Sequence, residues 1–104
     1  MELGVTMPHT GPSASAGHAA AVCRRADELG FACLWAVDHV VLPVHTDSEY
    51  GLGRRPTAIA DGALSQLLAP NLEQHTTLSW AAGLTERIGL GTGVLALQLR
   101  TPMV

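Results

Sequence analysis

Three stretches of the chain have the hydrophobic pattern of short strands. Residues 2–8 and 88–97 each combine apolar and β-branched positions, and the stretch from Ala32 to Pro43 contains no polar side chain before Asp38. An apolar run without polar alternation predicts a strand that is buried on both faces, as in parallel sheets.

Two stretches between these strands have helical character. In residues 15–29 apolar side chains recur at intervals of three and four, which predicts an amphipathic helix that a serine caps and Gly30 ends. A second helix is predicted from Pro70 to about Glu86, because proline is tolerated in the first turn of a helix. The order strand, helix, strand, helix, strand predicts an α/β fold with a parallel sheet.

Other parts of the chain give weaker signals. The segment from Asp38 to Leu68 contains two prolines and three glycines and has no sustained periodicity, although residues 58–68 are compatible with a short extra helix. A further helix is expected to begin at residues 101–104. Trp35, inside the second strand, is expected to be buried and to pack a helix against the sheet.

Composition and charge exclude several classes of partner. Of the 104 residues, 47% are hydrophobic and 14% charged, which is typical of a globular unit. The net charge is −3 and basic residues do not cluster with aromatic ones, so no nucleic-acid partner is expected. No apolar run is long enough to span a membrane and the N-terminus lacks a basic segment, so we expect a cytoplasmic protein. Cys23 and Cys33 have no companions at metal-binding spacing, so no metal site is expected and both are interpreted as buried fillers.

Asp38 and His39 follow the second strand and are the first candidates for chemistry. Parallel α/β folds build their sites at the carboxyl ends of strands, and an imidazole there is suited to proton transfer. His39 is therefore the candidate catalytic residue, with a hydrogen bond to a neighbouring loop as the structural alternative. Asp38 would orient that ring, contact a cofactor or cap the strand end. His9 follows the first strand and is the candidate substrate contact, unless it is only a turn residue.

The glycine-rich segment from Gly89 to Gly93 is not interpreted as a nucleotide-binding loop. A phosphate-binding glycine turn follows a strand and opens a helix, whereas this segment follows a helix and lies within a strand. Its glycines predict a close approach of the backbone, either for packing or to make room for a flat ligand.

Four segments, taken in order, match a known family. They are Glu28-Leu29-Gly30-Phe31 with Leu34-Trp35, Asp38 to Pro43, Thr85 to Val94, and Leu99 to Pro102. Together they closely resemble the luciferase-like flavin and deazaflavin oxidoreductases. The Asp-His pair after Leu-Trp is most similar to the branch that uses coenzyme F420.

The resemblance implies a (β/α)8 TIM barrel, of which residues 1–104 supply the first three strands with two helices, as part of one domain cut before its third helix. It implies an oxidoreductase that transfers a hydride between coenzyme F420, or alternatively FMN, and a small organic substrate. In the family the cofactor ring borders the positions of Asp38 and His39, and a non-prolyl cis peptide, here at Gly93–Val94, backs the ring.

Two positions depart from the family pattern. Ala69 stands where the family usually has an aspartate before Pro70, and the long loop keeps only Tyr50-Gly51 of an aromatic pattern. The alternative to a catalyst is a truncated, inactive product. Such a product would expose bare sheet edges, which favour homo-oligomers.

Overall fold

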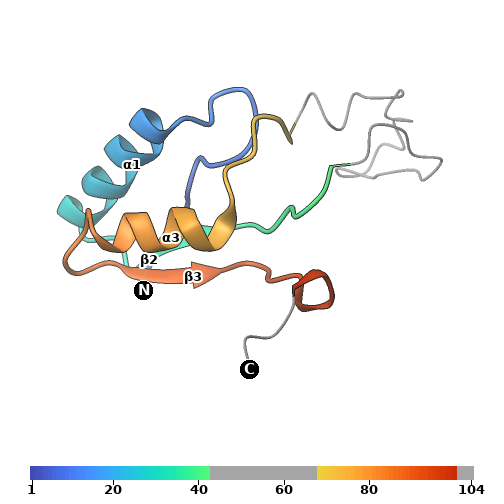
Figure 1. Cartoon of the computed structure of the whole chain (residues 1–104). Helices are drawn as coiled ribbons and strands as arrows, with labels where there is room; N and C mark the ends of the chain where they lie inside the picture. The colour runs from blue at the N-terminus through green and yellow to red at the C-terminus, as the bar shows by residue number, and fades with distance from the viewer. Residues whose placement is uncertain (43–67, 101–104) are drawn as a thin grey trace, which may run out of the picture.

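A three-stranded parallel sheet lies at the centre of the computed structural model, which describes residues 1–42 and 68–100. Its strands, in spatial order, are β1 (Gly4–Thr6), β2 (Cys33–Ala36) and β3 (Gly89–Thr92) (Figure 1). The register aligns Val5 with Leu34 and Leu34 with Leu90. The predicted α/β fold with a parallel sheet is confirmed, with strands shorter than the hydrophobic stretches. Closure into a barrel stays a prediction.

Helix α1 (Ala16–Glu28) connects β1 to β2 and matches its prediction at both ends. The Ser15 side chain accepts a hydrogen bond from the His18 N–H at 3.1 Å and so caps the first turn. Gly30, just beyond the helix, has a φ of +76°, a conformation that glycine adopts without steric cost.

Helix α3 (Gln74–Ala82) begins later than predicted and is shorter. The cis peptide Ala69–Pro70 precedes it, and the helix starts only after Glu73, whose carboxylate accepts a hydrogen bond from the Thr76 N–H at 2.6 Å. The prediction from Pro70 was wrong because this side chain, and not the proline, satisfies a free amide of the first turn. The acid at the helix start is therefore Glu73, so the departure at Ala69 does not concern the helix start.

Both helices cover the same face of the sheet (Figure 1). Leu34, at the centre of β2, is fully buried and belongs to a cluster with residues of α1 and α3. The buried members of this cluster are Met7, Cys23, Ala26, Leu34, Ala81 and Ile88. Cys23 is thus buried as predicted, whereas Cys33 is only half-buried, and burial raises the pKa of both thiols.

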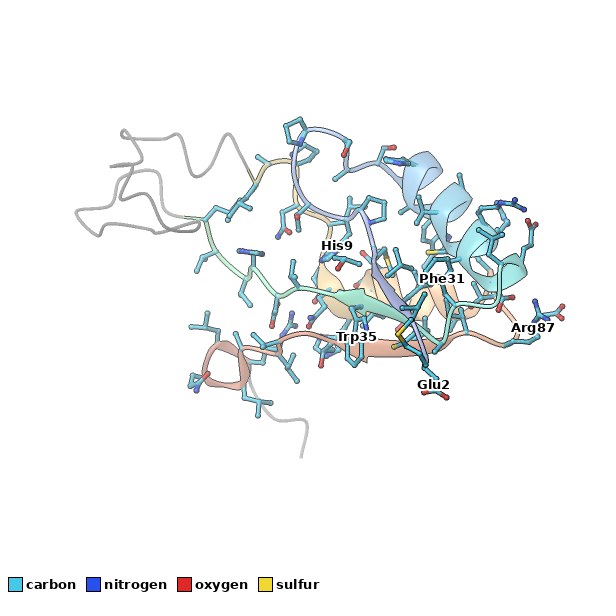
Figure 2. The ribbon with its side chains drawn as sticks, turned by 180° about the vertical axis from the view of Figure 1, so that it is seen from behind. Glu2, His9, Phe31, Trp35 and Arg87 are labelled. Atoms are coloured by element: carbon cyan, nitrogen blue, oxygen red, sulfur yellow. The ribbon has the colours of Figure 1, made fainter. Side chains whose placement is uncertain are left out.

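Trp35 lies on the opposite face of the sheet and is 44% exposed (Figure 2). A Cβ atom on Gly4 would lie 2.5 Å from Trp35 Nε1, and one on Gly91 would lie 2.5 Å from Trp35 Cζ3. The indole therefore packs over two glycines of the neighbouring strands, and not against a helix as predicted. The reason is strand alternation: Leu34 faces the helices, so its neighbour Trp35 must face away. Within residues 1–42 and 68–100 the helices cover only one face of β2, so the predicted burial on both faces is not found there, and Gly91 acts as a packing glycine.

Asp27, in the last turn of α1, joins this helix to the segment that leads into β3. Its carboxylate accepts hydrogen bonds from the N–H groups of Glu86, Arg87 and Ile88 at 3.0, 3.1 and 2.8 Å. These hydrogen bonds lower the pKa of Asp27. One side chain thus satisfies three consecutive backbone donors in the segment that leads into β3.

The third strand ends earlier than predicted, at Thr92, and the chain continues to the 3-10 helix η1 (Leu97–Leu99). Of the helix predicted at residues 58–68, positions up to 67 lie outside the described residues, as does the helix expected from residue 101. No helix within residues 1–42 and 68–100 is long and apolar enough to cross a membrane.

Candidate active site

A pocket lies beyond the carboxyl ends of β2 and β3 and has a cavity volume of about 200 Å³. Its walls come from the segment after β2, from the start of α3 and from the residue that follows η1. The lining residues are Asp38, His39, Val40, Asn71, Glu73, Gln74 and Arg100. Two predicted site residues, Asp38 and His39, are therefore brought together in one pocket at the expected edge of the sheet.

Arg100 binds two of these walls through its guanidinium group. Its Nε and Nη2 atoms donate to the two carboxylate oxygens of Asp38 at 2.9 and 2.7 Å, and Nη2 also donates to Glu73 at 2.9 Å. The Asp38 side chain is 1% exposed and accepts a third hydrogen bond, from the Ala96 N–H at 3.0 Å. The Arg100 hydrogen bonds hold the pKa of Asp38 below its usual range, and this pairing raises the pKa of Arg100. Asp38 is thus an anchored strand-end carboxylate, and its contact with a cofactor stays a prediction.

Glu73 carries a second negative charge at the rim of the pocket. The Thr76 N–H lowers the pKa of Glu73 to about 2, so the carboxylate is ionised at neutral pH. His75 Nδ1 lies 3.6 Å from the same carboxylate on the exposed side of the helix. The two carboxylates, Asp38 and Glu73, share the single cation Arg100, so this group of three carries one net negative charge.

Gln74 connects the ends of two strands beneath the pocket. Its side-chain Nε2 donates to the carbonyl oxygen of Ala36 at 2.7 Å and to that of Val94 at 2.9 Å. The residue is 2% exposed. Because both Nε2 hydrogens are used, the amide has a defined orientation. Its Oε1 atom is buried and has no hydrogen-bond partner among the described residues.

Asn71 and His39 contribute two further buried atoms of this kind. Asn71 is held beside the end of β1 by an isolated antiparallel bridge with Thr10, and its Nδ2 donates to the His39 carbonyl oxygen at 2.6 Å. Asn71 Oδ1 and His39 Nδ1 are buried and find no partner in residues 1–42 and 68–100. The pocket walls therefore contain three buried polar atoms that a ligand or an ordered water would satisfy.

His9 has a different environment from the one predicted. Its side chain is fully buried, with Nδ1 2.9 Å from the Met7 carbonyl oxygen and Nε2 2.9 Å from that of Val37. It lies beyond the end of β1, away from Glu2 at the other end of the strand (Figure 2), and does not line the pocket. The ring connects the ends of β1 and β2, and a substrate contact by His9 stays a prediction.

Gly93 and Val94 follow β3 directly, and the peptide bond between them is cis, as the resemblance implies. The Gly93 N–H donates to the Ala36 carbonyl oxygen at 2.8 Å, and the Val94 carbonyl oxygen accepts from Gln74. This segment is thus fixed by one hydrogen bond to the end of β2 and by another to Gln74 at the start of α3. Its contact with a cofactor is not tested by these contacts.

Five pocket residues were not predicted from the sequence as site residues, namely Val40 and the polar residues Asn71, Glu73, Gln74 and Arg100. Arg100 belongs to a segment that carries the resemblance, but its partner Asp38 is 62 positions away and nothing in their spacing indicates the pair. Gln74 falls within the helix predicted from Pro70 and was not singled out. Its role depends on burial against the strand ends, which the sequence does not show.

The sequence profile of luciferase-like monooxygenases matches residues 1–104. This chain belongs to the luciferase-like monooxygenase family. At the level of the superfamily the chain is therefore an oxidoreductase or monooxygenase, and the luciferase-like family generally uses flavin or F420 cofactors. Comparison with curated proteins gave no match, and comparison with solved structures gave none. Among the described residues of this luciferase-like chain, no three His, Cys, Asp or Glu side chains come together as a metal site would require.

Proposed function

We propose that residues 1–104 form the first three strands of a (β/α)8 oxidoreductase that transfers a hydride between coenzyme F420 and a small organic substrate. The observation that carries this proposal is the pocket at the carboxyl ends of the strands, in which His39 lies with polar side chains from two other segments. FMN is the alternative cofactor, since its ring has the same three-ring shape as a deazaflavin. The same proposal includes a cytoplasmic location and a small-molecule substrate.

The residues present fit one edge of such a ring. The unpartnered oxygens of Asn71 and Gln74 need hydrogen-bond donors, and ring systems of this kind carry one. The cavity, about 200 Å³, is smaller than the roughly 300–1,000 Å³ of pockets that enclose a whole ligand. The described residues therefore provide for an edge, and the rest of the cofactor site would come from later strands.

A bound flavin or deazaflavin would supply the hydride chemistry, while the protein supplies position and electrostatics. His39 Nδ1 is buried and unpartnered among the described residues, and is suited to take a proton from the substrate group or to return it. Arg100 fixes Asp38, the residue next to His39, by two hydrogen bonds. The histidine is thereby held at its place on the strand end without using its ring.

Substitution of His39 tests this role. We expect the 104 residues alone to bind cofactor weakly, so the turnover assay uses the chain joined to the remaining strands of a family domain. In that protein, His39→Ala should lower kcat by about 10²–10⁴-fold with F420 as hydride acceptor. His18→Ala is the matched control, because His18 is exposed on α1. An unchanged kcat under conditions where chemistry limits the rate would place His39 in a structural role, and turnover with FMN but not F420 would reverse the cofactor assignment.

A further inference from the structure

The side-chain amide of Gln74 uses its nitrogen in hydrogen bonds and leaves its oxygen without a partner among the described residues. Both Nε2 hydrogens are donated to backbone oxygens, those of Ala36 and Val94. Exchange of the oxygen and nitrogen positions would place Oε1 against two carbonyl oxygens, which is unfavourable. The buried Oε1 atom is therefore fixed as an acceptor, and it has no donor among the described residues.

The carboxylates nearby are not available for the same purpose. Asp38 accepts from Arg100 and from Ala96, and Glu73 accepts from Thr76 and Arg100. An incoming anion would also meet the net negative charge of these groups. Two of the polar atoms left for a ligand, Asn71 Oδ1 and Gln74 Oε1, are neutral acceptors, which select a group that donates a hydrogen bond and carries no negative charge.

We propose that Gln74 is a cofactor-positioning residue, whose Oε1 accepts a hydrogen bond from the imide N–H of the cofactor ring. This inference rests on the proposed function. The placement of Gln74 supports it, because its Nε2 is bonded to the Val94 carbonyl oxygen, in the segment that the resemblance assigns to the back of the ring. Oxidised flavins and deazaflavins both carry one imide N–H between two carbonyl groups, so the same contact serves either cofactor.

The test compares ligands that differ only at this nitrogen. The chain joined to the remaining strands of a family domain, as in the turnover assay, is titrated with riboflavin and 5-deazariboflavin, and with the derivative of each that is methylated at the imide nitrogen. Affinity is followed by ligand fluorescence, and the side-chain amide signals of Gln74 are followed by NMR. We expect the N–H forms to bind about 3- to 10-fold more tightly than the methylated forms, the effect of one neutral hydrogen bond.

Two variants identify the residue responsible. Gln74→Leu should remove the preference for the N–H forms, since leucine offers no acceptor. Gln98→Leu should keep it, because Gln98 is exposed on η1 and does not line the pocket. If the circular dichroism spectrum shows that Gln74→Leu does not fold, the wild-type NMR data decide. Chemical shift changes of the Gln74 side-chain amide with the N–H ligands alone support the contact, and equal changes with the methylated ligands contradict it.

The outcomes separate this inference from the proposed function. Equal binding of methylated and unmethylated rings, or a preference that survives Gln74→Leu, overturns the role of Gln74 and leaves the cofactor assignment intact. Failure of the wild-type joined protein to bind any of the four rings at the highest concentrations overturns the proposed function, and the inference with it.

Discussion

Substitution of Gly91 by alanine should destabilise the fold because the added methyl group meets the indole of Trp35. The new Cβ atom would lie 2.5 Å from Trp35 Cζ3 and 2.6 Å from Cε3. Carbon atoms in favourable contact are about 3.5–4.0 Å apart, so the ring must move by about 1 Å or the strands must separate. Trp35 is 44% exposed, which lets the ring move outward at the expense of its contact with the glycines. We expect a loss of about 1–3 kcal/mol in the free energy of unfolding, as for other overpacked sites.

Urea unfolding followed by circular dichroism measures this effect in a double-mutant cycle. In a Trp35→Ala background, Gly91→Ala should cost less by about 1 kcal/mol or more, because the clashing atoms are gone. Gly17→Ala is the matched control: a Cβ on Gly17 meets nothing within 4 Å, and alanine at this helical position should stabilise α1 by roughly 0.5–1 kcal/mol. If Gly91→Ala costs the same with and without the indole, the close approach of Trp35 does not explain the glycine.

Three further predictions follow from individual contacts. The pKa of Glu73 in the folded chain is about 2, below its ordinary value of 4.5, so the contribution of Glu73 to stability is present above about pH 4.5 and is lost as the pH falls towards 2. In measurements of the free energy of unfolding against pH, Glu73→Gln should flatten this dependence. Glu2→Gln, at an exposed site, should leave it unchanged. Asp27→Ala should lower the Tm in thermal unfolding by circular dichroism, because three backbone donors lose their acceptor; an unchanged Tm would show that water replaces the carboxylate. The outer edges of β1 and β3 have no strand partner among the described residues, so the 104-residue chain should show a molar mass that rises with concentration in sedimentation equilibrium, whereas a constant monomer mass would contradict this expectation.

The parts of the fold that could be predicted from sequence are those decided by contacts between near neighbours. Ser15 caps the start of α1 by accepting a hydrogen bond from an amide three residues away, and Gly30 ends the helix with a positive φ. Both effects act within one helical turn, so they can be predicted from neighbouring residues. The start of α3 was predicted at Pro70, because proline suits a first turn. It begins later, after Glu73, whose carboxylate caps the helix, and a choice between two capping signals in one short segment is settled only by the whole fold.

The exposure of Trp35 shows why burial was harder to predict than strand position. The run around it is wholly apolar, so alternation gives no sign of which face is covered. The covering depends on where the helices pack, and both lie on the side of Leu34. In the sequence, Gly4 and Gly91 indicate the uncovered face, because glycines leave room for the Trp35 indole to lie over the neighbouring strands.

The site divides in the same way between local and distant effects. Asp38 and His39 could be placed at the end of β2 because the apolar run directly before them predicts the strand and its carboxyl end, where parallel α/β folds build their sites. The contacts that separate their roles come from residues far along the chain. Arg100 and Ala96 bind the Asp38 carboxylate, while Asn71 binds only the His39 carbonyl oxygen.

This separation gives the two neighbours different tolerances to substitution. The Asp38 carboxylate accepts three hydrogen bonds in a site that is 1% exposed, so a change there acts first on the stability of the segments that Arg100 holds together. His39 Nδ1 is buried and has no hydrogen-bond partner in the described residues, so a substitution of His39 removes no hydrogen bond at that atom. Loss of stability should therefore follow substitution at Asp38, and loss of turnover with retained stability should follow substitution at His39. A protein in which both substitutions only destabilise the fold would have a structural strand end at this position, and the chemistry would have to be sought elsewhere in the pocket.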